Sequence, residues 1–296
     1  MAQLKKYVDL HIHTDASDGA LSAKGTVRKA IEHGLSAIAI TDHDSIDNVA
    51  IAVKEGKNHG LLIVPGVELT VDDYRNNIID IHILGLFIDI HNKPLNQLLM
   101  ISKKERFNQK KCIINKLQAL GYKINFEEVR ETAKGEIGRL HIAHVLLKRN
   151  KQLKNLGYIF EHLLGVGKPA YARRKHETGL KEAISAIHSA GGIAVLAHPY
   201  LYDSDFDNLI KKFVETGGDG LEVFYAYDKT AKFEKKPKNY LDNLQSRLKK
   251  IALKNNLSMS GGSDFHGHAR NKRIGYPKIP LEVVEQMKRM PINKRI

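Results

Sequence analysis

The sequence predicts an α/β barrel of parallel strands that carries an inserted helical subdomain. Strand-like and helix-like segments alternate up to residue 95, and the same alternation returns after residue 165. Polar residues stand where the predicted strands end, which is where barrels of this class gather their functional groups. The segment between is charged and helical. We therefore predict a barrel domain over 1–95 and 166–296, and an inserted helical subdomain over 96–165.

The first half contains four predicted strands and two predicted helices. Alternating or apolar runs that end in polar residues predict strands, and amphipathic runs that end at glycine predict helices. The strands are YVDLHIHT, LSAIAITDHD, LLIVPGVEL and IIDIHILGLFID, and the helices are TVRKAIEHG and NVAIAVKEGKNHG, which end at Gly34 and Gly60. This βαβα order indicates parallel strands whose polar ends lie at one open face of a barrel.

After the insert, three further strands alternate with three helices. The helices are LKEAISAIHSAGG, NLIKKFVETGG and YLDNLQSRLKKIALKNN, and the strands are IAVLAHPY, DGLEVFYA and LSMSGGSDFHG. The insert itself contains the helical stretches LLMISKKERFNQKKCIINKLQALG and RLHIAHVLLKRN. The strand ends again carry histidine and carboxylate residues.

Composition limits the classes of function. Cys112 is the only cysteine, so a thiolate zinc cage and an internal disulfide are excluded, and any metal must be held by nitrogen and oxygen. The net charge of +14 favours an anionic partner, although lysine-rich surfaces also serve solubility. No apolar stretch approaches the roughly 20 residues that span a bilayer, and the N-terminus lacks a signal-peptide core. We expect a cytoplasmic protein with no membrane contact and no obligate protein partner.

Metal-ligating residue types recur at the strand ends. His11 and His13 stand two residues apart on one strand, so both imidazoles project from the same face. Such a pair alone is weak evidence for a metal site, but most other predicted strands also have a histidine or a carboxylate residue near their ends. The candidate ligands are His11, His13, Asp18, His43, Glu68, His82, His198, Asp264 and His266. Nine ligands are more than one tetrahedral ion can bind, and this number suits two or three ions with bridging carboxylates.

Three neighbouring carboxylates have other expected roles. Asp42 and Asp44 flank His43, and we favour a supporting or capping role for them over direct ligation. Asp9 precedes His11 by two residues and is expected on the same face, where it would orient a ligand imidazole.

These motifs resemble the PHP (polymerase and histidinol phosphatase) family of metal-dependent phosphoesterases. DLHIHTDASDG, TDHDS, PGVEL, LAHPY and GGSDFHG match it in order and spacing, over roughly residues 5–95 and 165–270. RLHIA, GKPAY and AGGIAVLAHP resemble a narrower branch that cleaves the 3′-phosphate of nucleoside 3′,5′-bisphosphates or removes nucleotides from the 5′ end of short RNA, the RNase AM type. The resemblance implies a distorted (β/α)7 barrel with a trinuclear site, commonly Mn²⁺, under a helical insertion.

The resemblance also implies how the ligands divide among the ions. His11, His13 and Asp264 would hold one ion, and Glu68 would bridge it to a second. His82 and His198 would complete the second ion, and the third would take Asp18, His43 and His266. We expect Mn²⁺, with Fe²⁺, Zn²⁺ or Mg²⁺ as alternatives. Leu140, His144 and the stretch YARRKHETGL depart from the branch and put the substrate contacts in doubt.

The expected chemistry is hydrolysis by a metal-activated hydroxide, without a protein nucleophile. We assign proton transfer to the leaving oxygen to Asp264 or His198. Arg139, His141 and Lys168 are expected to bind a substrate phosphate away from the ions, because arginine forks onto phosphate and lysine offers a point charge. Arg173, Arg174 and Lys175 are interpreted as solvated surface charges.

The sequence therefore predicts a phosphoesterase for nucleoside 3′,5′-bisphosphates, a 5′→3′ exoribonuclease on short RNA, or both. The first alternative is a phosphatase for a metabolite such as histidinol phosphate. The second is a non-catalytic nucleic-acid-binding module that relies on the basic charge.

Overall fold

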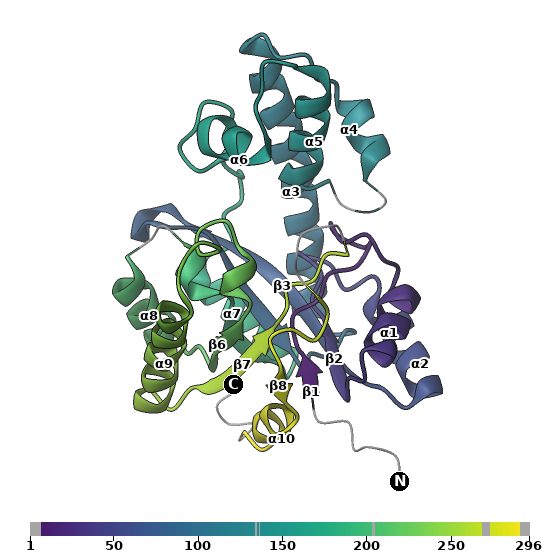
Figure 1. Ribbon diagram of the computed structural model, residues 1–296, viewed down its shortest axis with the longest axis vertical. Helices are drawn as coiled ribbons and strands as arrows, with labels where there is room; N and C mark the ends of the chain where they lie inside the picture. Colours follow the sequence, from purple (N-terminus) through teal and green to yellow (C-terminus); the bar gives the residue numbers. More distant parts are fainter. Residues whose placement is uncertain (1–6, 134, 136, 203–204, 268–272, 291–296) are drawn as a thin grey trace.

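Eight strands form one curved sheet in the computed structural model, which describes residues 7–133, 135, 137–202, 205–267 and 273–290 (Figure 1). The order across the sheet is β7-β6-β5-β4-β3-β2-β1-β8. The strands are β1 (Tyr7–Asp9), β2 (Ala37–Ile40), β3 (Leu62–Asp73), β4 (Ile78–Leu86), β5 (Ile193–Leu196), β6 (Gly220–Tyr225), β7 (Ser258–Gly262) and β8 (Ile279–Pro280).

β4 is antiparallel to both of its neighbours, β3 and β5, which corrects the expectation of an all-parallel barrel. Parallel neighbours need a long crossover, but β3 and β4 are joined only by the short 3₁₀ turn η1 (Tyr74–Asn76) and by Asn77 in a left-handed conformation. The pairs β1–β2, β2–β3, β5–β6 and β6–β7 are parallel. The reversal places His82 opposite Thr70 in the register.

The barrel closes between the ends of β1 and β7. Leu10 N–H donates to Gly261 O at 3.1 Å, and Asp264 N–H donates to His11 O at 2.9 Å. Gly262 permits this approach, because a Cβ there would lie 2.3 Å from the Cβ of His11. β8 pairs antiparallel with the start of β1, on the edge opposite β2. Seven strands thus complete a distorted barrel, which confirms the predicted fold class.

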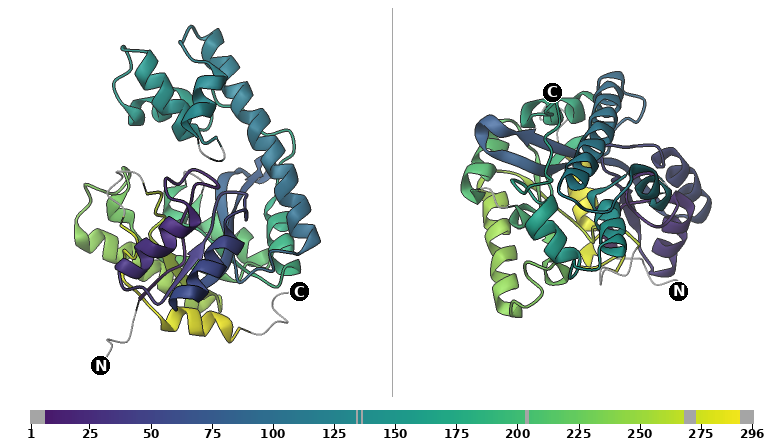
Figure 2. Two further views of the ribbon diagram at one scale, coloured as in Figure 1. Left: turned by 90° about the vertical axis from the view of Figure 1, so that its right-hand side faces the viewer. Right: turned by 90° about the horizontal axis from the view of Figure 1, so that it is seen from above.

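Helices cover the outside of the barrel, and one closes its lower end (Figures 1 and 2). α1 (Ala23–Glu32) and α2 (Val49–His59) lie beside β1 and β2, while α7 (Leu180–Ser189), α8 (Phe206–Glu215) and α9 (Lys238–Lys254) cover the opposite side. Apolar side chains from the strands, such as Val64, Leu84 and Val195, fill the interior together with Val284 of α10 (Glu282–Lys288). The short 3₁₀ turns η3 (Pro199–Leu201) and η4 (Tyr227–Lys229) follow β5 and β6.

The helical segment between β4 and α7 forms a separate lobe above the barrel (Figure 2). It contains α3 (Lys93–Ala119), α4 (Phe126–Thr132), α5 (Arg139–Arg149), α6 (Leu156–Ile159) and the π-helical turn η2 (Phe160–Leu164). Leu95 and Leu98 of α3 pack on the barrel, but from Ile113 to Ala172 the buried side chains form their own hydrophobic cluster. The helical character of the insert is therefore present, and its boundaries at 96 and 165 stay a prediction.

No helix in the described part of the chain is long and apolar enough to cross a membrane.

Candidate metal centre

Nine side chains that the sequence singles out converge at the upper end of the barrel. Seven lie in the segments that follow β1, β2, β5 and β7, whereas Glu68 and His82 lie within the antiparallel pair β3 and β4. The nine, all members of clusters with ligand atoms within 4.8 Å of one another, are His11, His13, Asp18, His43, Glu68, His82, His198, Asp264 and His266. The structure thus brings all nine predicted candidates together.

Glu68 lies at the centre of this cluster. Its Oε1 is 3.0 Å from His82 Nδ1 and 3.3 Å from His11 Nε2 and from His198 Nε2. Its Oε2 is 2.9 Å from His43 Nδ1 and 3.2 Å from His13 Nε2. One fully buried carboxylate therefore faces five imidazoles from four segments of the chain, because His11 and His13 share one segment.

Two further carboxylates extend the cluster on either side of His13. Asp264 Oδ1 is 3.2 Å from His13 Nε2 and 3.6 Å from His11 Nε2. Asp18 Oδ1 is 3.2 Å from His266 Nε2 and 4.0 Å from His43 Nε2. The ligand atoms form four overlapping groups: His11, His13 and Asp264; His11, Glu68 and His198; His43, Glu68 and His82; and His13, Asp18, His43 and His266. Because the groups share members, the division of ligands among ions stays a prediction.

Several polar atoms of the cluster are buried without a hydrogen-bond partner of acceptable geometry. Within the described residues these include His13 Nδ1, Asp18 Oδ1, His43 Nδ1, Glu68 Oε2, His82 Nδ1 and His198 Nδ1. Leaving such atoms unsatisfied is costly, so their concentration at one place points to a missing positive partner. Imidazole and carboxylate donors suit divalent ions such as Mn²⁺, Fe²⁺ and Zn²⁺. The residues present therefore fit a multinuclear metal site.

The electrostatics of the cluster lead to the same conclusion. Burial opposes ionisation of Glu68, but His43, His82 and His11 hold its pKa well below the usual range. Burial also lowers the pKa of His11, yet Glu222, Glu68 and Asp264 outweigh it and raise that pKa well above normal. The carboxylates likewise raise the pKa of His13 to about 10. Positive charge is thus favoured beside these buried carboxylates, and bound cations would supply it.

Glu222 on β6 is a supporting residue that the sequence interpretation missed. Its Oε1 is 3.0 Å from His11 Nδ1, and its Oε2 accepts a hydrogen bond from the backbone N–H of His198 at 2.7 Å. A carboxylate on the second nitrogen of an imidazole fixes the orientation of that ring. The sequence feature that could have pointed to Glu222 is a single glutamate within the apolar strand DGLEVFYA.

The role expected for Asp9 was wrong. Its carboxylate accepts hydrogen bonds from Ser263 Oγ at 2.6 Å and Gly275 N at 2.7 Å, so it fastens the end of β7 and does not orient an imidazole. Asp42 does act as a support, because it accepts hydrogen bonds from Thr14 Oγ1 at 2.6 Å and Ser17 Oγ at 2.5 Å.

Strained backbone is concentrated around this site. His198 has φ +26° and Asp264 has φ +51°, while Asp44 and Asp80 have φ +49° and +55°. Residues other than glycine rarely adopt these angles, and they persist at functional sites where the surroundings hold them. The side chain of Asp264 is also held, since Tyr225 O–H donates to its Oδ2 at 2.8 Å.

A cleft joins the cluster to the helical lobe. Its barrel side includes Asp18, His43 and His82, and its lobe side includes Arg139. Three more cations line it: Arg106 and Lys110 from α3, and Arg174 from the segment before α7. We call Arg106, Lys110, Arg139 and Arg174 the cleft cations.

Aspartates lie beside the three arginines, and Arg174 is 3.6 Å from Asp44 Oδ2 and 4.0 Å from Asp72 Oδ2. Arg106 Nη1 is 2.9 Å from Asp44 Oδ2, and Arg139 Nη2 pairs with Asp80 Oδ2. Lys110 Nζ donates to the uncharged Gln109 Oε1 at 2.8 Å. Burial and the neighbouring cations, Arg106 first, lower the pKa of Lys110 well below its usual range. The cleft thus favours a ligand that brings negative charge.

The structure separates the predicted phosphate contacts. Arg139 lines the cleft as expected. His141 instead accepts a hydrogen bond from Gly138 N–H at 2.9 Å on its Nδ1 and helps to cap α5, and Lys168 is exposed. Neither of these two is among the residues that line the described cleft. Arg174 is not a surface charge: only 6% of it is exposed, and it lies 3.6 Å from Asp44.

The family model for the PHP domain matches residues 9–246. A 5′-3′ exoribonuclease from Haemophilus influenzae is 33% identical over 265 residues, which cover 88% of this chain and 90% of that protein. A 3′,5′-nucleoside bisphosphate phosphatase from Chromobacterium violaceum is 30% identical over 274 residues, which cover 90% of this chain and 89% of that protein. A crystal structure assigned as a metal-dependent phosphoesterase from Bifidobacterium adolescentis matches with a TM-score of 0.78 and 26% identity, over 95% of this chain and 94% of that one.

Proposed function

The chain belongs to the PHP domain family, and on that premise we propose that it is a metal-dependent phosphoesterase for nucleotides. The proposed reactions are hydrolysis of the 3′-phosphate of nucleoside 3′,5′-bisphosphates and 5′→3′ removal of nucleotides from short RNA. The two curated relatives named above carry these two activities in their names. Both reactions would use one site, because each breaks a bond between phosphorus and a 3′-oxygen.

The observation that carries the proposal is the convergence of five imidazoles on the buried carboxylate of Glu68. We propose that the nine-residue cluster holds two or three divalent ions, with Mn²⁺ as the first choice. When bound, such ions polarise phosphoryl oxygens and make water a competent nucleophile near neutral pH. The cluster residues fix where those ions lie, and Glu222 fixes the ring of His11.

Proton transfer is assigned to residues at the edge of the cluster. Asp264 and His198 stay our candidates for protonating the departing 3′-oxygen. The Tyr225 hydroxyl holds Asp264 Oδ2, and Glu222 holds the backbone N–H of His198. Both candidates are therefore positioned by residues, Tyr225 and Glu222, that are not among the proposed metal ligands.

The cleft cations are proposed to bind the second phosphate of the substrate, away from the phosphorus that reacts. Arginine donors make short charge-assisted hydrogen bonds to phosphate, and three of the four cations are arginines. His141 and Lys168 stay weaker candidates for this contact. A substrate with two phosphates uses both the cluster and the cleft, which favours nucleotide substrates over a metabolite with a single phosphate.

The test is phosphate release by protein loaded with Mn²⁺. Adenosine 3′,5′-bisphosphate, a short 5′-phosphorylated RNA and histidinol phosphate are assayed side by side, with the His11→Ala/His13→Ala double variant as the control. We expect turnover of the first two substrates and none by the double variant. Turnover of histidinol phosphate alone would support the metabolite phosphatase. Tight RNA binding with every phosphoester left intact would support the non-catalytic binding module.

A further inference from the structure

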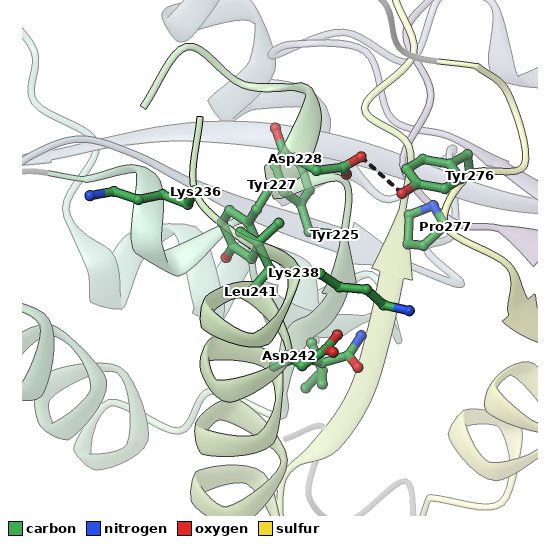
Figure 3. A pocket seen from close by; sticks show the side chains of 11 residues that line it. Tyr225, Tyr227, Asp228, Lys236, Lys238, Leu241, Asp242, Tyr276 and Pro277 are labelled. Atoms are coloured by element: carbon green, nitrogen blue, oxygen red, sulfur yellow. Dashed lines mark hydrogen bonds between the residues drawn. The ribbon is translucent and has the colours of Figure 1, made fainter. Parts of the chain in front are cut away.

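A second cavity lies beside the metal cluster, on the side of the barrel where α9 begins (Figure 3). Its volume is about 430 Å³, within the range of sites for small molecules. We call it the α9 pocket, and it is lined by Val223, Tyr225, Tyr227, Asp228, Lys236, Lys238, Leu241, Asp242, Gln245, Tyr276 and Pro277. It has no lining residue in common with the cleft beneath the helical lobe.

The cleft and the α9 pocket reach the cluster in different ways. The cleft includes Asp18, His43 and His82 directly. The α9 pocket connects to the cluster through Tyr225, whose hydroxyl donates to Asp264 Oδ2 at 2.8 Å. The cleft therefore approaches the cluster at Asp18, His43 and His82, and the α9 pocket approaches it at Asp264, through Tyr225.

A phosphodiester substrate requires such an arrangement. In the proposed exonuclease reaction the oxygen of a water molecule bonds to phosphorus, the P–O3′ bond breaks, and a proton passes to the departing 3′-oxygen. The phosphate stays on the 5′-oxygen of the downstream nucleotide. The upstream nucleoside and the downstream nucleotide are thus attached to different oxygens of one phosphorus, and each needs its own cavity.

The side chains of the α9 pocket suit a nucleotide. The ring of Tyr276 is 39% exposed, and its hydroxyl donates to Asp228 Oδ2 at 2.9 Å, which fixes the ring at the pocket edge (Figure 3). An exposed, fixed aromatic ring is a platform on which a base can stack. Figure 3 shows Lys238 reaching out from the start of α9, below Tyr276 and Pro277 in this view, where its charge can meet a phosphate. Gln245 and Asp242 add hydrogen-bonding groups for a base or ribose.

We propose that the α9 pocket is a subsite for the nucleotide downstream of the scissile phosphate, with Tyr276 stacking on its base and Lys238 contacting its backbone. The inference rests on the proposed function and extends it, because it makes short 5′-phosphorylated oligonucleotides better substrates than mononucleotide bisphosphates. The surrounding segment from 229 to 238 is basic, with five exposed lysines and one glutamate, as expected along the path of an anionic strand.

The test compares kcat/KM for a 5′-phosphorylated RNA of several nucleotides with kcat/KM for adenosine 3′,5′-bisphosphate, and follows the ratio of the two. Tyr276→Ala should lower this ratio at least about fivefold, the loss expected for one stacked base, and Lys238→Ala should lower it at least about fivefold because one charged contact with a phosphate is lost. Tyr276→Phe keeps the ring and should retain most of the ratio. Higher salt should shrink the effect of Lys238→Ala, since that contact is electrostatic.

Matched controls are present on α9 itself. Tyr240 is 40% exposed and Lys250 is exposed, and neither lines the α9 pocket. Tyr240→Ala and Lys250→Ala should leave the ratio at the wild-type value. A second readout is independent of turnover: fluorescence anisotropy of labelled 5′-phosphorylated RNA with EDTA present should show weaker binding by Tyr276→Ala and Lys238→Ala, but not by the controls.

The outcomes separate the subsite from the proposed function. If the wild type hydrolyses both substrates and the ratio does not change in Tyr276→Ala and Lys238→Ala, the subsite assignment is overturned and the phosphoesterase stands. Hydrolysis of the bisphosphate without any hydrolysis of RNA also overturns the subsite. Failure to hydrolyse either substrate overturns the proposed function together with the subsite.

Discussion

The metal cluster and the cleft beneath the helical lobe are neighbours, yet they are built differently. The cluster is made by barrel strands and by the segments that follow them, whose positions the sheet fixes, and Glu68 alone contacts five histidines. The cleft cations come from α3, α5 and the segment before α7, and they are placed by how the lobe packs on the barrel. We infer that the cluster sets the chemistry and the cleft sets the substrate, so changes in the two regions should have different kinetic effects.

The largest effect is expected from Glu68→Gln. The substitution removes the central negative charge and leaves five imidazoles facing a neutral amide, so divalent ions lose their shared ligand. Because supporting residues around a metal site already contribute about 10- to 100-fold, kcat/KM should fall by more than about 100-fold. Phosphate release and the metal content per chain measure the effect. Glu215→Gln, at an exposed glutamate of α8, is the control and should match the wild type.

Glu222→Gln should have the next largest effect. The amide can still accept the hydrogen bond from His198 N–H, but it no longer places a charge on His11 Nδ1. Metal affinity or activity should fall about 10- to 100-fold. A competition titration with a metal chelator gives the affinity. An unchanged affinity and rate would show that Glu222 does not position His11.

Arg174→Ala tests the cleft and separates it from the cluster. The variant loses one charged donor near Asp44, which keeps its 2.9 Å contact with Arg106. Hydrogen bonds to charged groups contribute about 1.5–3 kcal/mol, so KM for adenosine 3′,5′-bisphosphate should rise about 10- to 100-fold while the metal content stays constant.

The neighbouring arginine is a matched control for that experiment. Arg173 is exposed, and its guanidinium lies 3.9 Å from the centroid of the Tyr74 ring. Arg173→Ala should change KM by less than about twofold, because an exposed charge is screened by solvent and salt. Equal effects of the two substitutions on KM would show that Arg174 does not bind the substrate phosphate directly.

The smallest effect is expected from Lys168→Ala. Lys168 is exposed and does not line the described cleft, so its contribution is a screened long-range attraction. KM should rise by less than about threefold, and the change should vanish at high salt. A larger rise in KM that does not depend on salt would show that Lys168 contacts the phosphate directly, as the motif GKPAY suggested.

The difference between the metal cluster and the cleft also explains which residues could be predicted from the sequence. His11 and His13 were recognisable because strand alternation places i and i+2 on one face and because similar residues end the other strands. Arg173 and Arg174 are adjacent and chemically identical, and only the fold buries one against Asp44 and exposes the other. No local pattern distinguishes them.

Two other differences have equally local causes. β4 was expected to be parallel, but a turn of a few residues cannot make the crossover that a parallel strand needs. Glu222 was overlooked because nothing near a single glutamate in an apolar strand shows its role. Only the fold places this residue of β6 against His11. His82 was found at the correct place although its strand runs in the opposite direction, because alternate residues of a strand face the barrel interior whichever way the strand runs.

The central claim is that the nine-residue cluster binds divalent ions and that these ions are required for phosphoester hydrolysis. The most direct measurement is to strip the protein with a chelator, add Mn²⁺ stepwise, and follow bound ions per chain and phosphate release from adenosine 3′,5′-bisphosphate in the same samples. We predict that activity appears as two or three ions bind, and that Glu68→Gln neither retains these ions nor recovers activity. Full activity of the stripped wild type, or of Glu68→Gln without bound ions, would contradict the claim.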